Sequence, residues 1–285
     1  MTSTVVARID RDLVVVSGPD ATSFLQSLVS QDLDPVAVGE AVHALLLEPR
    51  GKLVADLRAA RVADDEWWCV GEPGVGEVLA TGLSRFKIRV KVDIDDRSGQ
   101  VAAAAVRGTD APDVPADVRA IPVAWGSELG AELIGSPETI DDAVRTLVEA
   151  GATEVDADAY EALRIEAGVP RQFYDIDETT IAQEAYLDRD AVSFTKGCFV
   201  GQELVCRIDT RGHVNRLLRR LRADVPVERG SAVEVDGKAV GTVTSSAGAV
   251  ALAMLRREVE PGGSVLVRKG ASEGGVTARV EAIGD

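Results

Sequence analysis

Cysteine and histidine are scarce in this sequence of 285 residues. The three cysteines, Cys69, Cys198 and Cys206, form no C-x-x-C pair, and His43 and His213 are the only histidines. An odd number of scattered cysteines argues against a disulfide framework, and these spacings match no common zinc or iron-sulfur ligand set. We therefore expect reduced thiols and no metal held by this chain alone, while a site shared with a partner stays open.

The sequence also lacks a long apolar run. Hydrophobic residues make up 46% of the chain, yet no uninterrupted stretch approaches the ~18 residues that cross a membrane. Arg8, Asp10 and Asp12 stand where a signal peptide has its apolar segment. We expect a cytoplasmic protein without membrane contact.

Positive charge is in deficit, because the formal net charge is −16. This balance argues against tight, direct binding to nucleic acid, which depends on lysine and arginine at the phosphates. One cluster of positive charge contrasts with the negative net charge. It consists of Arg207, Arg211, Arg216, Arg219, Arg220 and Arg222. The cluster is either a solvated face or a surface that steers an anionic ligand, such as a polyglutamate tail.

Length and residue patterns predict two domains. In the first, residues 1–215, mixed helices and strands indicate an α+β fold with a mostly antiparallel sheet. The predicted strands cover 13–16, 41–47, 52–62, 67–70, 87–94, 101–106 and 118–123. The predicted helices begin after Asp20 and cover 75–86, 138–150 and 156–168, with a short helical piece at 181–187. Residues 216–285 alternate short strands with glycines and predict a small β-barrel or sandwich with a hairpin turn at 236–238.

Residues 196–203, Lys-Gly-Cys-Phe-Val-Gly-Gln-Glu, concentrate reactive side chains between two glycines. Gly197 and Gly201 permit unusual backbone geometry or a close ligand approach. Cys198 lies between them as the one thiol placed to act. The alternative is a loop punctuated by glycines whose small cysteine is buried.

Three further charged residues stand in apolar surroundings. Asp56 lies in the returning strand of a hairpin and faces either solvent or a pocket. Arg164 and Glu166 lie near a helix end. They are either exposed helix charges, or the carboxylate faces a ligand and accepts paired N–H donors such as those of a pterin.

Residues 196–203 resemble the K-G-C-[FY]-x-G-Q-E signature of the YgfZ family, folate-binding relatives of the glycine cleavage T-protein. Residues 18–26, 163–170 and 241–245 are similar to other parts of the family, so the resemblance spans nearly the whole chain. The sequence departs from the family in having Ala182 where a proline usually precedes the Gln-Glu pair. It departs from the T-protein hairpin in having single residues, Gly51 and Asp56, where that hairpin has paired glycines and paired acids.

The resemblance implies a T-protein-like cloverleaf, in which parts of the first 215 residues bind tetrahydrofolate or a one-carbon derivative and the remainder forms the barrel. It makes Glu166 the ligand of the pterin edge and makes Asp56 the counterpart of an acid used in aminomethyl transfer. Cys198 and Asp56 are the catalytic candidates. The full set of expected folate contacts is Asp56, Arg164, Glu166, Lys196, Gly197, Phe199, Gly201, Gln202, Glu203 and Arg207.

The function implied is support of iron-sulfur enzyme assembly or repair and, through these enzymes, of tRNA modification. Iron-sulfur proteins or their assembly factors would be the partners, and a folate-dependent transferase-like activity is left open. We expect Lys196 to favour the Cys198 thiolate. Two alternatives remain: an aminomethyltransferase of the glycine cleavage system, which uses a carboxylate and no thiol, and a non-catalytic scaffold.

Overall fold

The computed structural model describes residues 4–268 and 274–284. Two compact units are present. The first is made of the chain up to Ala157 together with Leu187–Cys206, and the second of Asp158–Tyr186 and the chain from Arg207 onward. The chain thus leaves the first unit and returns to it before the C-terminal strands begin. In the described part of the chain, no helix is long and apolar enough to cross a membrane.

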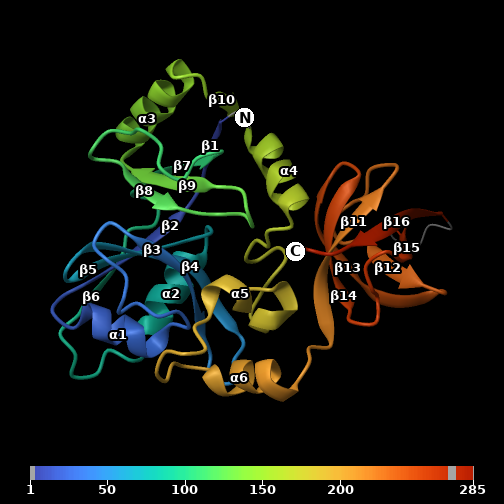
Figure 1. Ribbon diagram of the computed structural model, residues 1–285, viewed down its shortest axis with the longest axis horizontal. Coiled ribbons are helices and arrows are strands. Elements are labelled where there is room, and N and C mark those ends of the chain that lie inside the picture. Colours follow the sequence, from blue (N-terminus) through green and yellow to red (C-terminus); the bar gives the residue numbers. More distant parts are fainter. Residues whose placement is uncertain (1–3, 269–273, 285) are drawn as a thin grey trace. The chain divides into compact units, whose positions relative to one another are not determined.

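The first unit contains an antiparallel sheet with two helices on one face (Figure 1). Its strand order is β3-β4-β5-β2-β6. The strands are β2 (Asp12–Ser17), β3 (Ala41–Leu47), β4 (Leu53–Ala63), β5 (Glu66–Gly71) and β6 (Asp93–Asp96). The helices are α1 (Ala21–Leu28) and α2 (Val75–Ser84). Along β4, buried Leu53, Ala55 and Leu57 alternate with half-buried residues, so the two faces of the strand differ.

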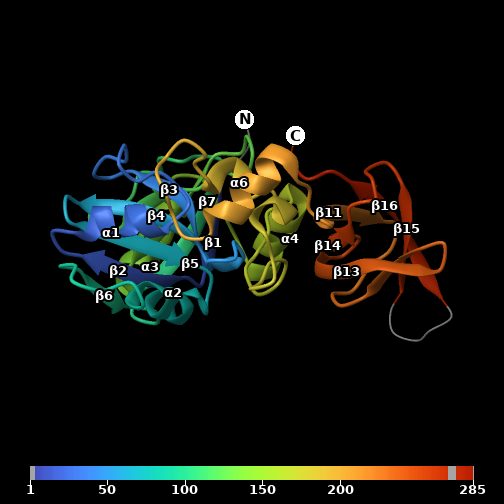
Figure 2. The ribbon, with the colours of Figure 1, turned by 90° about the horizontal axis from the view of Figure 1, so that it is seen from below.

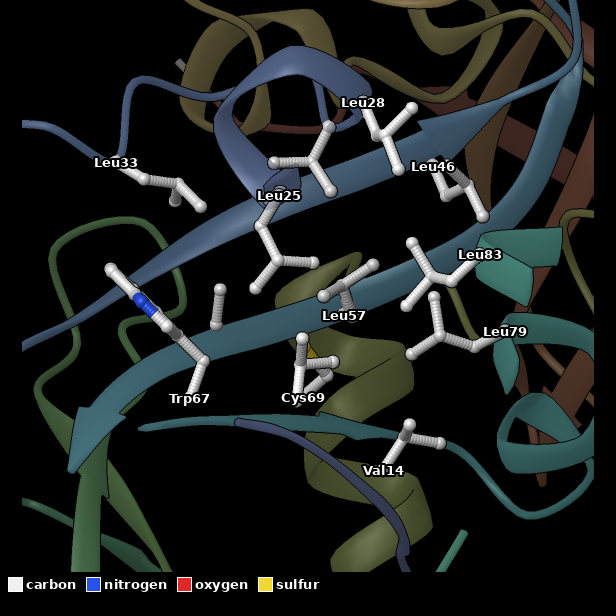
Figure 3. Packing of buried hydrophobic residues seen from close by; sticks show 14 of the residues in the cluster. Val14, Leu25, Leu28, Leu33, Leu46, Leu57, Trp67, Cys69, Leu79 and Leu83 are labelled. Atoms are coloured by element: carbon white, nitrogen blue, oxygen red, sulfur yellow. The ribbon is translucent and has the colours of Figure 1, made fainter. Parts of the chain in front are cut away.

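Alternate residues of these strands form the main core under the helices (Figure 3). Leu46, Leu57 and Cys69 come from three neighbouring strands, and Leu25 and Leu79 reach them from α1 and α2. Burial raises the pKa of Cys69 to about 12, so this thiol behaves as a core side chain. The face opposite this core is left for polar groups of β3 and β4.

A second five-stranded sheet completes the first unit, in the order β10-β1-β7-β9-β8. Its strands are β1 (Val5–Ile9), β7 (Ala102–Arg107), β8 (Arg119–Pro122), β9 (Gly130–Gly135) and β10 (Thr153–Val155). All pairs are antiparallel except β1 with β10. Helix α3 (Pro137–Glu149) covers one face, and its N-terminus is capped by Ser136, which accepts a hydrogen bond from Thr139 N. The sequence patterns did not identify β1, β9 or β10.

The predicted strand over residues 87–94 is wrong. Only Asp93–Asp96 joins the sheet, as β6 beside β2. Ile88 is 72% exposed and Arg89 has a φ of 59°, a conformation that ends a strand. The segment is held instead by the turn before α1, where Lys91 N donates to Asp20 Oδ2 at 2.7 Å. Most of the alternating residues that predicted a strand therefore lie in a loop.

The second unit contains a closed six-stranded barrel, with the order β11-β14-β13-β12-β15-β16 (Figures 1 and 2). The strands are β11 (Arg216–Ala223), β12 (Ala232–Val235), β13 (Lys238–Ala247), β14 (Val250–Arg256), β15 (Ser264–Arg268) and β16 (Gly275–Glu281). Asp236 and Gly237 both have positive φ, as a two-residue hairpin turn requires. The predicted barrel alternative and its hairpin turn are confirmed.

Three further helices and one 3-10 turn lie in the described part of the chain. They are α4 (Ala157–Ala167), η1 (Ala182–Ala185), α5 (Asp188–Ala191) and α6 (Gln202–Arg211), in addition to α3 above. Helix α4 confirms the helix predicted after Asp156. The predicted domain boundary between residues 215 and 216 stays a prediction, although the first barrel strand does begin at Arg216.

Candidate functional site

The second glycine of the 196–203 segment lies directly against the β3–β4 hairpin turn. Gly201 has a φ of +81°, and a Cβ there would stand 2.5 Å from Glu48 O and 2.8 Å from Leu47 Cβ. Gly51, in the hairpin turn, has a φ of +79°, and its own Cβ would stand 2.9 Å from Gly201 O. Two backbones therefore meet at a distance that only glycine allows. Gly201 fixes the start of α6 on the hairpin.

The loop before Gly201 presents the thiol. Cys198 is exposed, and Gly197 has no atom within 4 Å of where a Cβ would stand. The next side chain, Phe199, is only 7% exposed, and its backbone N–H donates to Gln202 Oε1 at 3.2 Å. Glu203 is exposed in the first turn of α6. The buried alternative for Cys198 is therefore wrong: the thiol faces outward between two anchored residues.

Lys196 anchors the other end of the loop. Its Nζ donates to the backbone carbonyls of Gln26, Val29 and Gln31 at 2.7, 2.8 and 2.8 Å. These carbonyls lie around the C-terminal end of α1, where a cation is favoured. Burial lowers the pKa of Lys196 to about 8, with Asp32 and Asp34 opposing the shift. The Lys196 ammonium group is thus hydrogen-bonded to carbonyls around the end of α1. Its predicted effect on the Cys198 thiolate stays a prediction.

The hairpin itself carries an ion pair on the face opposite the core. His43 pairs with Arg58 in the β3–β4 ladder, and Asp56 lies two residues before Arg58 on the same face of β4. His43 Nε2 and Asp56 Oδ1 are in direct hydrogen-bond contact, and their side chains are 15% and 18% exposed. Asp56 therefore faces a polar partner rather than bulk solvent. His43 is the functional candidate that the sequence pattern missed.

The charges around this pair decide its ionisation. Burial pushes the pKa of Asp56 up, but the charge and hydrogen bond of His43 and the cations Arg58 and Arg11 outweigh it, and the pKa is lowered. Burial and Arg58 lower the pKa of His43, and Asp56 only partly opposes them. The favoured state is an ionised Asp56 beside a neutral His43.

Arg11 extends this polar face toward the second sheet. Its guanidinium bonds Glu132 Oε1 at 2.6 Å and Oε2 at 3.0 Å, and it lies 3.0 Å from Glu72 Oε1. Burial would raise the pKa of Glu132, but Arg11, Arg58 and Arg107 lower it. Within the first unit, charges of alternating sign therefore run from Asp56 to Glu132.

The other expected site residues belong to the second unit. Arg164 is 4% exposed, and its guanidinium donates to Glu161, Asp175 Oδ2, Ser245 Oγ and the Val169 carbonyl. All five N–H groups of the side chain have an acceptor in this set. A ligand contact by Arg164 would have to replace one of these bonds, so in the structure this residue serves the fold.

Glu166 lies near the C-terminal end of α4, with its side chain 51% exposed. Arg222 Nη2 donates to Glu166 Oε1 at 2.5 Å, and Oε2 accepts no hydrogen bond from any residue the structure describes. Arg222 and Arg220 both bond Glu281, and Arg216 bonds Glu184. Much of the arginine cluster is therefore neutralised by local acids. Arg207 is exposed on α6.

The expected site residues thus fall into two groups. The first unit brings the 196–203 segment onto the hairpin that carries Asp56, and the second carries Arg164, Glu166 and Arg207. Across residues 4–268 and 274–284, no group of three or more His, Cys, Asp or Glu side chains could hold a metal ion.

Comparison with known proteins places two family models on this chain. Residues 12–119 match the GCVT N-terminal domain, and residues 216–283 match the CAF17 C-terminal beta-barrel domain. The first match covers the sheet with α1 and α2 and extends into the second sheet. The second match covers the barrel.

Two curated relatives are aminomethyltransferases. The protein of Lysinibacillus sphaericus is 28% identical over 262 residues, which cover 81% of this chain and 71% of the relative. That of Herpetosiphon aurantiacus is 27% identical over 255 residues, which cover 81% and 70%. The solved structure of glycine cleavage system aminomethyltransferase T from Bartonella henselae superimposes with a TM-score of 0.81 at 20% identity, covering 99% of this chain and 86% of that one. The predicted α+β fold of the T-protein type, with its C-terminal barrel, is confirmed.

Proposed function

We propose that this protein binds tetrahydrofolate or a one-carbon derivative and supports the assembly or repair of iron-sulfur enzymes, and through them tRNA modification. Cys198 would be the working thiol. The observation that carries the proposal is the exposed Cys198, held between the anchors Lys196 and Gly201. Two further observations favour this function over that of a T-protein. They are the resemblance of residues 196–203 to the YgfZ signature and the match of the barrel to the CAF17 type.

The carboxylates suit a reduced pterin, which offers N–H donors along its edge. Asp56 is an ionised acceptor because its pKa is lowered, and its side chain is 18% exposed. Glu166 keeps one oxygen without a hydrogen bond from the described residues. When bound, tetrahydrofolate would supply amine nitrogens that carry a one-carbon unit, and each of these carboxylates is a proposed acceptor for its N–H groups.

Titration with tetrahydrofolate under anaerobic conditions tests this assignment. Asp56→Ala and Glu166→Ala are each expected to weaken binding by about tenfold or more, since a hydrogen bond to a charged group is lost. Calorimetry measures the affinity, and circular dichroism checks the fold of each variant. Glu149→Ala removes an exposed carboxylate on α3 and should bind as the unchanged protein does. Equal affinity in all three variants would remove the proposed pocket.

The proposed partners are iron-sulfur proteins or their assembly factors, in the cytoplasm and away from membranes. Tight, direct binding to nucleic acid is not part of the proposal, because the formal net charge is −16 and much of the arginine cluster is paired with acids. An effect on tRNA would then be indirect, through the enzymes that modify it.

An aminomethyltransferase is the second candidate. The His43–Asp56 pair favours it, because aminomethyl transfer needs a carboxylate that steers a proton, and both curated relatives carry that name. Incubation with an aminomethylated lipoyl carrier and tetrahydrofolate separates the candidates. Release of ammonia together with methylene-tetrahydrofolate would favour the transferase, and a Cys198→Ala variant that is fully active in this assay would support it further.

A further inference from the structure

The contact between His43 and Asp56 defines which imidazole nitrogen carries the proton. Nε2 is the atom that meets Asp56 Oδ1. An ionised carboxylate only accepts hydrogen bonds, so Nε2 must be the donor. In a neutral imidazole the other nitrogen, Nδ1, then keeps its lone pair. No described residue makes a hydrogen bond to Nδ1 of His43, and the side chain is 15% exposed.

Charged groups from three elements act on this pair. Asp56 and Arg58 come from β4, and Arg58 Nη1 lies 4.0 Å from Asp56 Oδ1. Asp190 of α5 raises the pKa of His43, and Arg11, which follows β1, lowers that of Asp56. The net effect keeps the imidazole neutral and the carboxylate ionised near neutral pH. A neutral imidazole of this tautomer can accept a hydrogen bond at Nδ1.

We propose that His43 and Asp56 act as one hydrogen-bonding pair, in which Asp56 fixes the Nε2–H tautomer and Nδ1 of His43 accepts a hydrogen bond from an N–H of a bound reduced folate. This inference rests on the proposed binding of tetrahydrofolate. The contact is a hydrogen bond, and the ligand nitrogen keeps its proton. No bond to carbon forms or breaks, and no oxidant or reductant is needed.

The His43–Asp56 pair can be tested first in the protein without ligand. Because the chain has only two histidines, nitrogen NMR of protein labelled in its imidazole rings resolves His43 with His213 as an internal reference. His43 should show the Nε2–H tautomer and titrate below the ordinary imidazole value of about 6.5. Asp56→Asn should change the tautomer and the titration of His43 and leave the His213 signals in place. A mixture of tautomers at His43 that Asp56→Asn does not alter would overturn the pair.

Binding of tetrahydrofolate as a function of pH tests the ligand. The affinity of the unchanged protein should fall as His43 becomes protonated on acidification. His43→Gln keeps an N–H for Asp56 but lacks the Nδ1 acceptor and does not titrate, so it should bind roughly tenfold more weakly at neutral pH and lose this pH dependence. His213→Gln should behave as the unchanged protein does.

The binding and NMR measurements distinguish a failure of this inference from a failure of the proposed function. Equal binding by His43→Gln and the unchanged protein at every pH would overturn the role of Nδ1 while leaving folate binding intact. Absence of tetrahydrofolate binding to the unchanged protein would overturn the proposed function and the ligand assigned to the pair. The NMR titration of the free protein would still decide whether His43 and Asp56 form the hydrogen-bonding pair.

Discussion

Arg164→Met is expected to lower the free energy of unfolding by about 3–5 kcal/mol. The Asp175 side chain is fully buried, and Arg164 Nη1 lies 2.9 Å from its Oδ2. Removing the guanidinium leaves that carboxylate without its buried counter-ion, and desolvation is then uncompensated. The same change removes the bond to Ser245 Oγ on β13, which ties the end of α4 to the barrel.

Urea denaturation followed by circular dichroism measures this loss. Arg222→Met is the matched control, because Arg222 and its partner Glu166 are 42% and 51% exposed. That pair is screened by solvent, and its removal should cost less than about 1 kcal/mol. Equal losses in the two variants would contradict the assignment of Arg164 to the buried network. The double variant Arg164→Met with Asp175→Asn should recover part of the lost stability, since the orphaned charge is removed.

Gly201→Ala is expected to destabilise the protein by about 2–4 kcal/mol, from the left-handed backbone and from overpacking together. The new methyl group would stand 2.5 Å from the carbonyl oxygen of Glu48 and 3.1 Å from Gly51 Cα. Both are backbone atoms of the hairpin turn, so no side chain can move aside. We also expect the Cys198 loop to shift with the start of α6.

Gly197→Ala is the control within the same segment. Its φ is not in the left-handed region, and nothing lies within 4 Å of its Cβ position. Thermal unfolding should therefore give a melting temperature close to that of the unchanged protein for Gly197→Ala and a clearly lower one for Gly201→Ala. The two glycines of one motif then have different roles: Gly201 packs, and Gly197 keeps the space beside Cys198 open.

Much of the fold could be predicted because its signals are local. Helix α3 begins at Ser136 and Pro137, and the β12–β13 turn needs the left-handed conformations that Asp236 and Gly237 adopt. Two of the strands that were missed, β1 and β10, depend on distant partners. β1 pairs with β7 and β10, which lie about 100 and 150 residues away in sequence, and β9 begins and ends at glycine.

Site residues that are adjacent in one segment could be predicted from the sequence. Site residues that meet only when two strands pair could not. The composition of 196–203 indicated Cys198 directly. Finding His43 required the β3–β4 register, which places it on the same face as Asp56. The roles of Arg164 and Lys196 depend on which acceptors the fold brings to them, and sequence spacing does not reveal those acceptors.

Replacement of Cys198 tests the central claim most directly. In cells that lack this protein, Cys198→Ala and Cys206→Ala are expressed at equal levels, and the fraction of tRNA modified by an iron-sulfur enzyme is measured. The account predicts that Cys198→Ala folds and binds tetrahydrofolate yet leaves modification at the level of the deleted strain, while Cys206→Ala restores it. Full restoration by Cys198→Ala would contradict the proposed role of the Cys198 thiol and would favour a non-catalytic scaffold.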